Sequence, residues 1–354
     1  MINHKDVASF LGSCPRPLLE SDEILLGHGS GGKLTADLLD RVFLPAFHNP
    51  YLDRLDDQAV LDIHGTRLAF TTDSFVVTPI FFPGGDIGKL AVNGTVNDLA
   101  MSGARPLFLS AGFILEEGCP LSDLQRIVAS MRAACEAAGV LLVTGDTKVV
   151  NRGSGDKVFI NTSGIGLVDQ DTHISADRAQ VGDLILLSGT IADHGMAVMS
   201  TREGLELDTE IVSDTAPLHE LVAAMLDVSR EIHCLRDPTR GGIAGTLNEL
   251  AKQSNVGIAI EECSIPMKEE VKGLCEILGI DPLYVANEGK LVAIVGRQAA
   301  DPLLARIKNL PGGQEARVIG EVVADHPGMV IMKTRIGGTR IVDLMMGEQL
   351  PRIC

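Results

Sequence analysis

The chain has 354 residues, 45% of them hydrophobic, and this length predicts two globular domains of about 150 residues each. Its formal net charge of -17 argues against a nucleic-acid partner, because binding to a phosphate backbone depends on clustered Lys and Arg. A small nucleotide stays compatible with this charge, since backbone N–H groups and a Mg²⁺ ion bridging to carboxylates can hold its phosphates.

The cysteine spacing and the first residues of the chain indicate in which cellular compartment the protein is expected. The 7 cysteines form no CxxC pair, which argues against a structural zinc site and against a secreted disulfide framework. The first residues lack the apolar run of a signal peptide, and no stretch reaches the roughly 20 apolar residues that a membrane-spanning helix needs. We therefore expect a cytoplasmic protein without a membrane anchor.

The first half of the chain predicts an α+β domain over residues 21–170, after an extended leader. The leader, residues 1–20, contains Pro15 and Pro17 and has little periodicity. Apolar runs predict strands over 67–77, 106–115, 139–150 and 157–168, and helices over 88–103 and 122–139. The last two strands are expected to be adjacent, in a βαββαβ order with helices on one face of a mixed sheet.

The apolar pattern then restarts and predicts a second α+β domain over 171–335. Strands are predicted over 184–192, 232–237, 256–262, 290–296, 316–323 and 329–334, and helices near 194–203, 242–252 and 268–278. The remaining residues, 336–354, have a weak apolar stretch followed by Pro351. We expect them to form an extended, mobile tail.

Acidic side chains lie at the ends of apolar segments in the first half. They are Asp56, Asp57, Asp73, Asp98 with the preceding Asn97, and Asp146. Loops at these positions can bring the carboxylates together, and Mg²⁺ prefers such hard oxygen ligands while it bridges substrate phosphates. Each residue alone is more often a cap or a turn, so only their accumulation favours a metal–nucleotide site.

A glycine-rich segment, GHGSGGKL at residues 27–34, nearly matches the phosphate-binding motif GxxxxGK[ST]. Leu34 stands where that motif needs a hydroxyl to coordinate Mg²⁺, so we reject a P-loop NTPase. Two uses of the segment stay open, a flexible loop that contacts phosphates and a simple hinge.

Three residues are candidates for catalysis. Lys148 comes just past an apparently buried strand beside Asp146, and Glu288 precedes the strand at 290–296; either is also compatible with a surface position. A Lys in a cleft can stabilise developing negative charge, and a Glu can accept a proton from a reacting amide. Cys354, the last residue, fills no core and can swing into a nucleotide site, although an incidental terminal Cys is the alternative.

Taken together, the motifs resemble the HypE family of hydrogenase maturation factors, the carbamoyl dehydratases. The motifs are GHGSGGK, LDDQAV, TTDSFVV, NGTVNDLAMSGA, TGDTKVV, GDLILLSGTIADHG, DPTRGG, ANEGK and the closing PRIC. The internal ones are similar to those of the wider superfamily of aminoimidazole-ribonucleotide synthetase and selenophosphate synthetase, whereas PRIC at the terminus is typical of HypE.

This resemblance implies a two-domain PurM-like fold, in which the N-terminal domains of a homodimer form a barrel of strands with the ATP sites at their seam. It implies that a carbamoyltransferase, HypF, loads a carbamoyl group onto the Cys354 sulfur. The enzyme then uses ATP to dehydrate this group to a thiocyanate, and the HypC–HypD complex accepts the cyanide for the iron of a [NiFe]-hydrogenase.

The resemblance also implies roles for individual residues. The ATP-binding residues would be Gly29, Ser30, Gly31, Gly32, Lys33, Asp73, Asn97, Asp98 and Asp146. The Mg²⁺ ligands would be Asp56, Asp57, Asp73, Asp98 and Asp146, while Lys148 and Glu288 would handle the nitrogen proton of the group on Cys354. Two alternatives stay open: a superfamily enzyme that acts on a free small molecule, and a non-catalytic carrier of Cys354 that binds no ATP.

Overall fold

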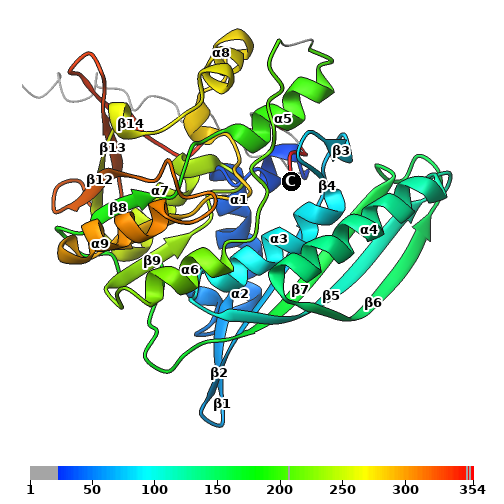
Figure 1. Cartoon of the computed structure of the whole chain (residues 1–354), viewed down its shortest axis with the longest axis horizontal. Coiled ribbons are helices and arrows are strands. Elements are labelled where there is room, and N and C mark those ends of the chain that lie inside the picture. Colours follow the sequence, from blue (N-terminus) through cyan, green and yellow to red (C-terminus); the bar gives the residue numbers. More distant parts are fainter. Residues whose placement is uncertain (1–22, 206–207, 348–349, 351) are drawn as a thin grey trace, which may run out of the picture.

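The computed structural model describes residues 23–205, 208–347, 350 and 352–354. The leader predicted over residues 1–20 lies outside the described residues. Figure 1 shows two α+β halves side by side, with the C-terminal end of the chain between them. Among the described helices, none is both long and apolar enough to cross a membrane.

The N-terminal half is one mixed sheet with helices on one face. Its strands are β1 (Ala59–Ile63), β2 (Thr66–Phe75), β5 (Arg105–Glu116), β6 (Leu141–Val150) and β7 (Val158–Leu167), and the helices that cover it are α3 (Ile87–Ala100) and α4 (Leu121–Ala138). Two short helices, α1 (Lys33–Leu38) and α2 (Leu44–Phe47), precede β1 and are not predicted from the sequence. A short hairpin of β3 (Phe81–Phe82) and β4 (Gly85–Asp86) leads into α3. The strand order is β1-β2-β7-β5-β6, and β5 runs parallel to β6 because α4 connects them as a crossover.

The strands and helices predicted for this half are confirmed, but two details of the prediction are wrong. From β1 onward, and apart from the β3–β4 hairpin, the elements follow the order ββαβαββ and not βαββαβ. Two differences cause this: β1 precedes β2, and α4 comes directly after β5, so that β6 and β7 are consecutive. The apolar pattern misses β1, whose side chains are only partly buried. Strands β6 and β7 are consecutive in the chain but not adjacent, because β5 lies between them.

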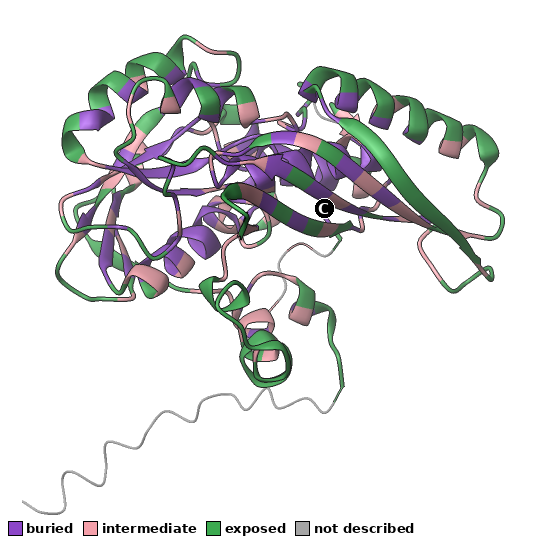
Figure 2. Cartoon of the chain, turned by 90° about the horizontal axis from the view of Figure 1, so that it is seen from below, coloured by how far each residue is buried: buried purple, intermediate pink, exposed green. Residues whose placement is uncertain are grey.

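In the part of the chain that the structure describes, no helix covers the sheet face opposite α3 and α4, as Figure 2 shows. A row of apolar side chains crosses this face: Phe70 lies opposite Ile165, Ile165 opposite Phe108, and Phe108 opposite Leu141. These four side chains are 39% to 64% exposed. A contiguous exposed apolar surface of this kind marks an interaction site.

The C-terminal half is built on a larger sheet. Its strands are β8 (Leu184–Leu187), β9 (Ile232–Arg236), β10 (Gly257–Glu261), β11 (Val292–Val295), β12 (Arg317–Val323), β13 (Val330–Lys333) and β14 (Thr339–Val342), in the order β14-β13-β10-β12-β8-β11-β9. Its helices are α5 (Asp193–Arg202), α6 (His219–Leu226), α7 (Gly242–Ser254), α8 (Glu269–Leu278) and α9 (Arg297–Lys308). Strand β11 is buried along its whole length, which explains its continuous apolar run in the sequence.

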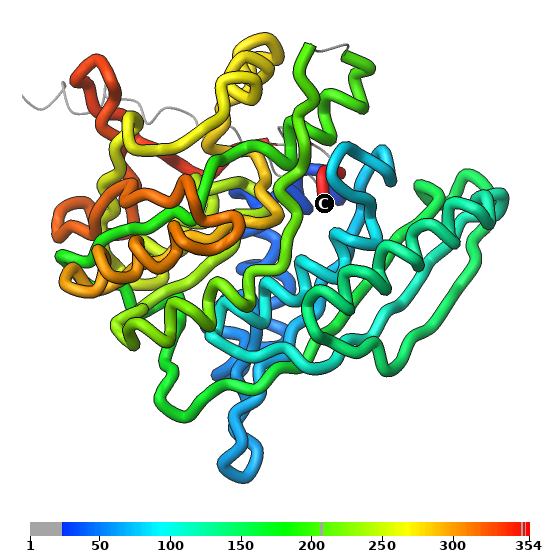
Figure 3. Tube along the Cα trace, viewed as in Figure 1, coloured from blue at the N-terminus to red at the C-terminus, as the bar shows by residue number. Residues whose placement is uncertain are grey.

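The strands and helices predicted for this half are also confirmed, while α6, α9 and β14 are not predicted. Pro302 inside α9 argues against a helix in the sequence pattern. β14 corrects the predicted tail at 336–354, because Thr339–Val342 pair with β13 in an antiparallel ladder. The Cα trace in Figure 3 then brings the chain end back between the two halves.

Candidate active site

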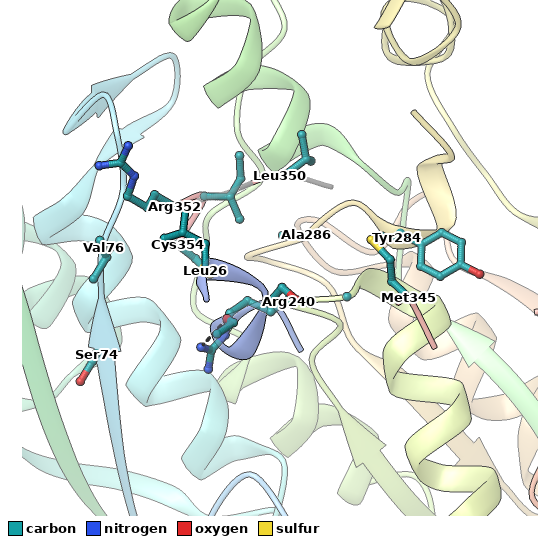
Figure 4. Close-up of a pocket in the computed structure, with 14 residues that line it drawn as sticks. Leu26, Ser74, Val76, Arg240, Tyr284, Ala286, Met345, Leu350, Arg352 and Cys354 are labelled. Carbon is teal, nitrogen blue, oxygen red and sulfur yellow. Dashed lines mark hydrogen bonds between the residues drawn. The ribbon is translucent and has the colours of Figure 1, made fainter. Parts of the chain in front are cut away.

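The last residues of the chain line a cavity of about 300 Å³ between the two halves. The backbone N–H groups of Val76 and Thr78 donate to the carbonyls of Cys354 and Arg352, at 3.0 and 3.2 Å. The chain end therefore runs alongside the segment that follows β2. Figure 4 shows Cys354 beside Val76, with Arg240 below it.

The glycine-rich segment forms part of the wall of this cavity. Gly29 and Ser30 line it together with Cys354. Gly31 has φ +75, and a Cβ atom there would lie 2.9 Å from the carbonyl oxygen of Arg240, so this position requires glycine. The segment is thus packed directly against the loop of the C-terminal half that carries Arg240.

The next residues of the segment are bound to the start of the tail. The N–H of Lys33 donates to the carbonyl of Met345 at 2.9 Å, and a Cβ at Gly32 would meet the same oxygen at 2.5 Å. The Lys33 ammonium pairs with Asp343, with Nζ and Oδ2 at 2.6 Å. In this arrangement Lys33 is engaged by a carboxylate, and Gly31 to Lys33 are not among the residues that line the cavity.

Three carboxylates from separate elements form a buried cluster. Asp57 precedes β1, Asp98 lies in the last turn of α3, and Asp237 follows β9, and oxygens of all three lie within 4.8 Å of one another. The hydroxyl of Thr71 donates to Asp98 Oδ2 at 2.8 Å, and Arg236 Nε lies 3.1 Å from Asp57 Oδ1. The cluster joins both halves of the molecule.

The electrostatics of this cluster favour a bound cation. Burial raises the pKa values of Asp57 and Asp98 well above their usual range, and burial raises the pKa of Asp237 to about 7. The neighbouring carboxylates raise the pKa of Asp98 further. Asp57 Oδ2 is buried and has no hydrogen-bond partner among the described residues. Hard oxygen donors with an unused lone pair suit Mg²⁺.

Glu288 lies in the interior near this cluster, with 2% of its surface exposed. Its Oε1 atom has no hydrogen-bond partner among the described residues. Burial raises the pKa of its carboxyl well above the usual range, and repulsion from Asp237 and Asp214 adds to this effect. A carboxylate with a raised pKa is a stronger proton acceptor than an exposed one.

Arg240 is the cation that links Cys354 to the acids. It lies in the loop between β9 and α7, and its Nη1 donates to the carbonyl of Gly29 at 3.3 Å. The negative charge of Cys354 in its thiolate form, and the charges of Asp73 and Glu288, raise the pKa of the Arg240 guanidinium. The same charge partly opposes the rise that burial causes in the pKa of Asp73.

The thiol of Cys354 is protonated in this position. Burial raises its pKa above the ordinary value, and the negative charge of Glu288 raises it further, while Arg240 opposes the shift. The position therefore does not favour a thiolate, which is the nucleophilic form of Cys. It suits a sulfur that already carries a neutral group.

Two of the sequence-predicted site residues, Asn97 and Asp56, make hydrogen bonds to the backbone of distant segments. Asn97 donates to the carbonyl of Ala216 at 3.1 Å and accepts from the N–H of Leu218 at 2.8 Å, so its amide joins α3 to the C-terminal half. Asp56 accepts from the N–H of Ala176 at 2.8 Å and does not belong to the carboxylate cluster.

Asp146 and Lys148 lie apart from the other predicted site residues. They pair with each other on β6, with Lys148 Nζ 2.6 Å from Asp146 Oδ2, and both side chains are exposed. β6 is an exposed edge strand, so the buried strand expected before Lys148 is wrong. β5 and β7 separate β6 from β2, which places Asp146 about 14 Å across the sheet from Asp73.

Sequence reasoning did not assign Asp237 or Arg240 to the site, although both lie in the motif DPTRGG. The signal for them was a run of charged residues directly after a buried strand, β9, and before the glycines that begin α7. Such a run can be read as an ordinary turn. Asp237 and Arg240 can be recognised as site residues only in the folded structure, where they lie near Asp98 and Cys354, which are distant in the sequence.

Both halves match family models. The AIR synthase related protein, N-terminal domain, matches residues 55–168, and the AIR synthase related protein, C-terminal domain, matches residues 180–333. The fold and the carboxylate cluster therefore define a two-domain protein of the AIR synthase related class.

Individual relatives show to which family within this class the chain belongs. Carbamoyl dehydratase HypE of Azotobacter vinelandii is 55% identical over 336 residues, which is 95% of this chain and 98% of that protein. The HypE of Escherichia coli is 48% identical over 338 residues, 94% of this chain and 100% of that protein. The chain belongs to the HypE family of carbamoyl dehydratases, which confirms the resemblance seen in the sequence.

Solved structures agree with this assignment. A HypE–HypF complex contains a chain that is 52% identical, with a TM-score of 0.83, and the match covers 87% of this chain and 99% of that one. HypE in complex with ATP is 50% identical, with a TM-score of 0.79, and the match covers 94% of this chain and 100% of that one. The predicted two-domain PurM-like α+β fold is thereby confirmed.

Proposed function

We propose that this chain uses ATP to dehydrate an S-carbamoyl group on its own Cys354 to a thiocyanate, which supplies the cyanide ligand of a [NiFe]-hydrogenase. The family of carbamoyl dehydratases supports this function, and ATP as the second substrate is supported by the relative solved with ATP. The observation that carries the proposal is the position of Cys354, which lies in a cavity with Ser30 and Arg240 and close to Glu288.

Mg²⁺ is the cation that this proposal requires, and Asp57, Asp98 and Asp237 are the residues that would hold it. When bound, Mg²⁺ neutralises phosphate charge. The fit is supported by the hard oxygen donors, by the unpartnered Asp57 Oδ2, and by the raised pKa values of the cluster. Gly29 and Ser30 are proposed to contact the phosphates from the cavity wall.

The reaction has two steps. The carbamoyl oxygen attacks the γ-phosphorus of ATP, ADP leaves, and one nitrogen proton passes to solvent. The carbon–oxygen bond then breaks, phosphate leaves, and the second nitrogen proton passes to Glu288 as the S–C≡N group forms. Glu288 suits this role because its buried carboxylate has a raised pKa and a free Oε1 among the described contacts. Arg240 stabilises the negative charge that develops on oxygen.

Lys148 and Asp146 are proposed to act at a dimer seam. Within one chain they lie three strands away from β2, on the open face of the sheet. The apolar row from Phe70 to Leu141 on the same face supports pairing with a second copy, which would form the barrel. Asp73 lies on the other face of β2, toward α3 and Arg240, and is proposed to contact Mg-ATP from there.

The proposed partners follow from the chemistry of the group that is carried. A carbamoyltransferase, HypF, is proposed to load Cys354, and one solved relative is a HypE–HypF complex. The HypC–HypD complex is proposed as the cyanide acceptor, and the cytoplasm as the compartment. An incidental terminal Cys, with a free small molecule as the substrate, is the competing interpretation.

Intact mass tests the proposal. The protein is incubated with the carbamoyltransferase and its carbamoyl donor, and wild type is compared with Cys354→Ala. A carbamoyl adduct that loses one water only with ATP, and only when Cys354 is present, supports the proposal. An unchanged mass while ATP is still hydrolysed overturns it and favours the free substrate.

A further inference from the structure

The buried imidazole of His194 holds the backbone of the chain end. His194 lies in the first turn of α5 and is completely buried. Its Nε2 atom lies 2.7 Å from the carbonyl oxygen of Ile353, the residue before Cys354. Its Nδ1 atom lies 2.8 Å from the hydroxyl oxygen of Ser213.

The hydrogen-bond partners fix the tautomer of His194. A carbonyl oxygen only accepts, so Nε2 carries the proton and donates to Ile353. Nδ1 then accepts from the Ser213 hydroxyl, whose oxygen in turn accepts from the N–H of Thr215 at 3.2 Å. Burial lowers the pKa of His194, which favours this neutral form. The three hydrogen bonds therefore point the same way, from Thr215 N–H to Ser213, from Ser213 to His194, and from His194 to the carbonyl of Ile353.

Packing holds the imidazole ring in this orientation. The ring of Phe82 meets the ring of His194 edge-on, with centroids 5.3 Å apart and an angle of 86°. Ile353 O is the sole hydrogen-bond partner of His194 Nε2 among the described residues. The proposed dehydration chemistry does not use this imidazole, so its orientation needs another explanation.

The same helix makes a second contact with the chain end. Arg202, in the last turn of α5, donates to the carbonyl of Arg352 at 2.7 Å and to the carbonyl of Thr78 at 2.8 Å. Both ends of α5 therefore bind backbone carbonyls of the two residues before Cys354. Backbone contacts of this kind hold the chain end whatever group the sulfur carries.

We propose that His194, oriented by Ser213, is a positioning residue that holds carbamoylated Cys354 in the site during dehydration. This inference rests on the proposed function. Loading by a carbamoyltransferase requires the half-buried sulfur to leave the cavity between the two halves, because the active site of a second enzyme cannot enter that cavity. The contact therefore accelerates dehydration and opposes loading, a combination that a merely structural residue does not produce.

Four variants of the full chain test this role. His194→Phe keeps a buried ring and removes the donor to Ile353, whereas His194→Gln places an amide donor near the same position. Ser200→Ala is the matched control, because Ser200 is buried in the same helix and its hydroxyl bonds to Ala197 within that helix. Ser213→Ala removes the orienting group alone, and tests the role if His194→Phe does not fold.

The two steps are measured separately by intact mass. We expect His194→Phe to slow the loss of water from the carbamoylated protein by about 10- to 100-fold, since a buried acceptor loses its donor. Loading of Cys354 should stay equal or become faster. His194→Gln should recover at least part of the dehydration rate, Ser213→Ala should show a smaller loss, and Ser200→Ala should match wild type.

Alkylation of unmodified Cys354 gives a readout that does not depend on the proposed function. With exposed Cys263 as the internal reference, Cys354 should react faster in His194→Phe than in wild type, as measured by peptide mass mapping. An unchanged alkylation rate and an unchanged dehydration rate in the folded variant overturn the inference. Faster alkylation in a protein whose wild type never dehydrates supports the contact and overturns the proposed function.

Discussion

The side chain of Asn97 in α3 donates a hydrogen bond to the backbone carbonyl of Glu288 across 3.3 Å. The two residues belong to different halves of the molecule, so the carboxylate that we propose as the base is held in place by the N-terminal half. The same amide also binds the backbone at Ala216 and Leu218. Asn97 is therefore a connection between the halves that keeps Glu288 beside the carboxylate cluster.

Replacement of Asn97 by Ala should weaken this connection. The variant loses buried hydrogen bonds to three backbone groups, and we expect the free energy of unfolding to fall by about 2–3 kcal/mol. Urea unfolding measures the change. Asn309→Ala is the control, because the Asn309 side chain bonds to Ala305 on the surface. Equal stabilities of the two variants would contradict the role of Asn97.

Glu288→Gln should keep ATP binding and lose dehydration. The amide fills the same space but cannot accept the nitrogen proton, so we expect the dehydration rate to fall by about 10²- to 10⁴-fold. Loss of water from the carbamoylated protein is followed by mass, and ATP binding by calorimetry. The control is Glu261→Gln at the exposed end of β10. Normal nitrile formation by Glu288→Gln would remove Glu288 from the mechanism.

The carboxylate cluster should make the metal-free protein less stable as the pH rises. The folded pKa of Asp237, about 7, is above its unfolded value, so the folded state binds more protons between about pH 4 and pH 7. Stability present at low pH is therefore lost as the pH rises through this window, by on the order of 2 kcal/mol. Thermal unfolding from pH 5 to pH 8 measures this loss.

Asp237→Asn should flatten that pH profile, and added Mg²⁺ should stabilise wild type at pH 8 but not the variant. Both results have the same cause, which is the repulsion among the carboxylates of the cluster. A bound cation or a neutral amide at position 237 relieves this repulsion. A metal-free wild type whose stability rises from pH 5 to pH 8 would contradict the assignment of a cation site to Asp57, Asp98 and Asp237.

Gly31→Ala should be more harmful than Gly65→Ala. Both glycines have positive φ, at +75 and +82, so both substitutions strain the backbone by about 1 kcal/mol or more. Only at Gly31 does the new Cβ also meet a backbone oxygen, that of Arg240, at 2.9 Å, while the space around Gly65 is open. We expect weaker ATP binding for Gly31→Ala alone, measured by calorimetry. Equal affinities of the two variants would contradict the packed loop.

Phe108→Lys should dissociate the proposed dimer. The residue lies at the centre of the exposed apolar row on the sheet, and a charge there opposes burial of that face. Sedimentation velocity measures the change from dimer to monomer. Ile336→Lys, at a position 95% exposed in the other half, is the control. A Phe108→Lys protein that sediments as wild type does would exclude this face as the contact.

The sequence was sufficient to locate the elements with strong apolar periodicity, and it was less informative about exposure. β6 is as apolar as a buried strand, yet its side chains are exposed at the edge of the sheet. Its apolar run is consistent with an interface to a second copy, which periodicity within one chain cannot distinguish from a core. In α9 the sequence misleads in a different way: the segment is helical, but Pro302 inside it argues against a helix in the sequence pattern.

The candidate site could be predicted only in part because it is assembled from segments far apart in the sequence. Asp57 and Asp98 are recognisable as acids at the ends of apolar segments, but the third member of the cluster, Asp237, comes from the other half. Nothing in local spacing indicates that Asn97 binds backbone groups while Asp98, the next residue, joins the acids. That difference arises from the helical turn, which directs neighbouring side chains to different faces.

The most direct test follows the carbamoyl oxygen. Protein that carries an ¹⁸O-labelled carbamoyl group on Cys354 is given ATP, and the released phosphate is analysed by mass spectrometry. If the oxygen is phosphorylated and leaves as phosphate, the label appears in inorganic phosphate, and the carbamoylated protein loses the mass of one ¹⁸O-labelled water as the thiocyanate forms. Unlabelled phosphate, with the ¹⁸O still on the protein or in water, would contradict an ATP-dependent dehydration at Cys354.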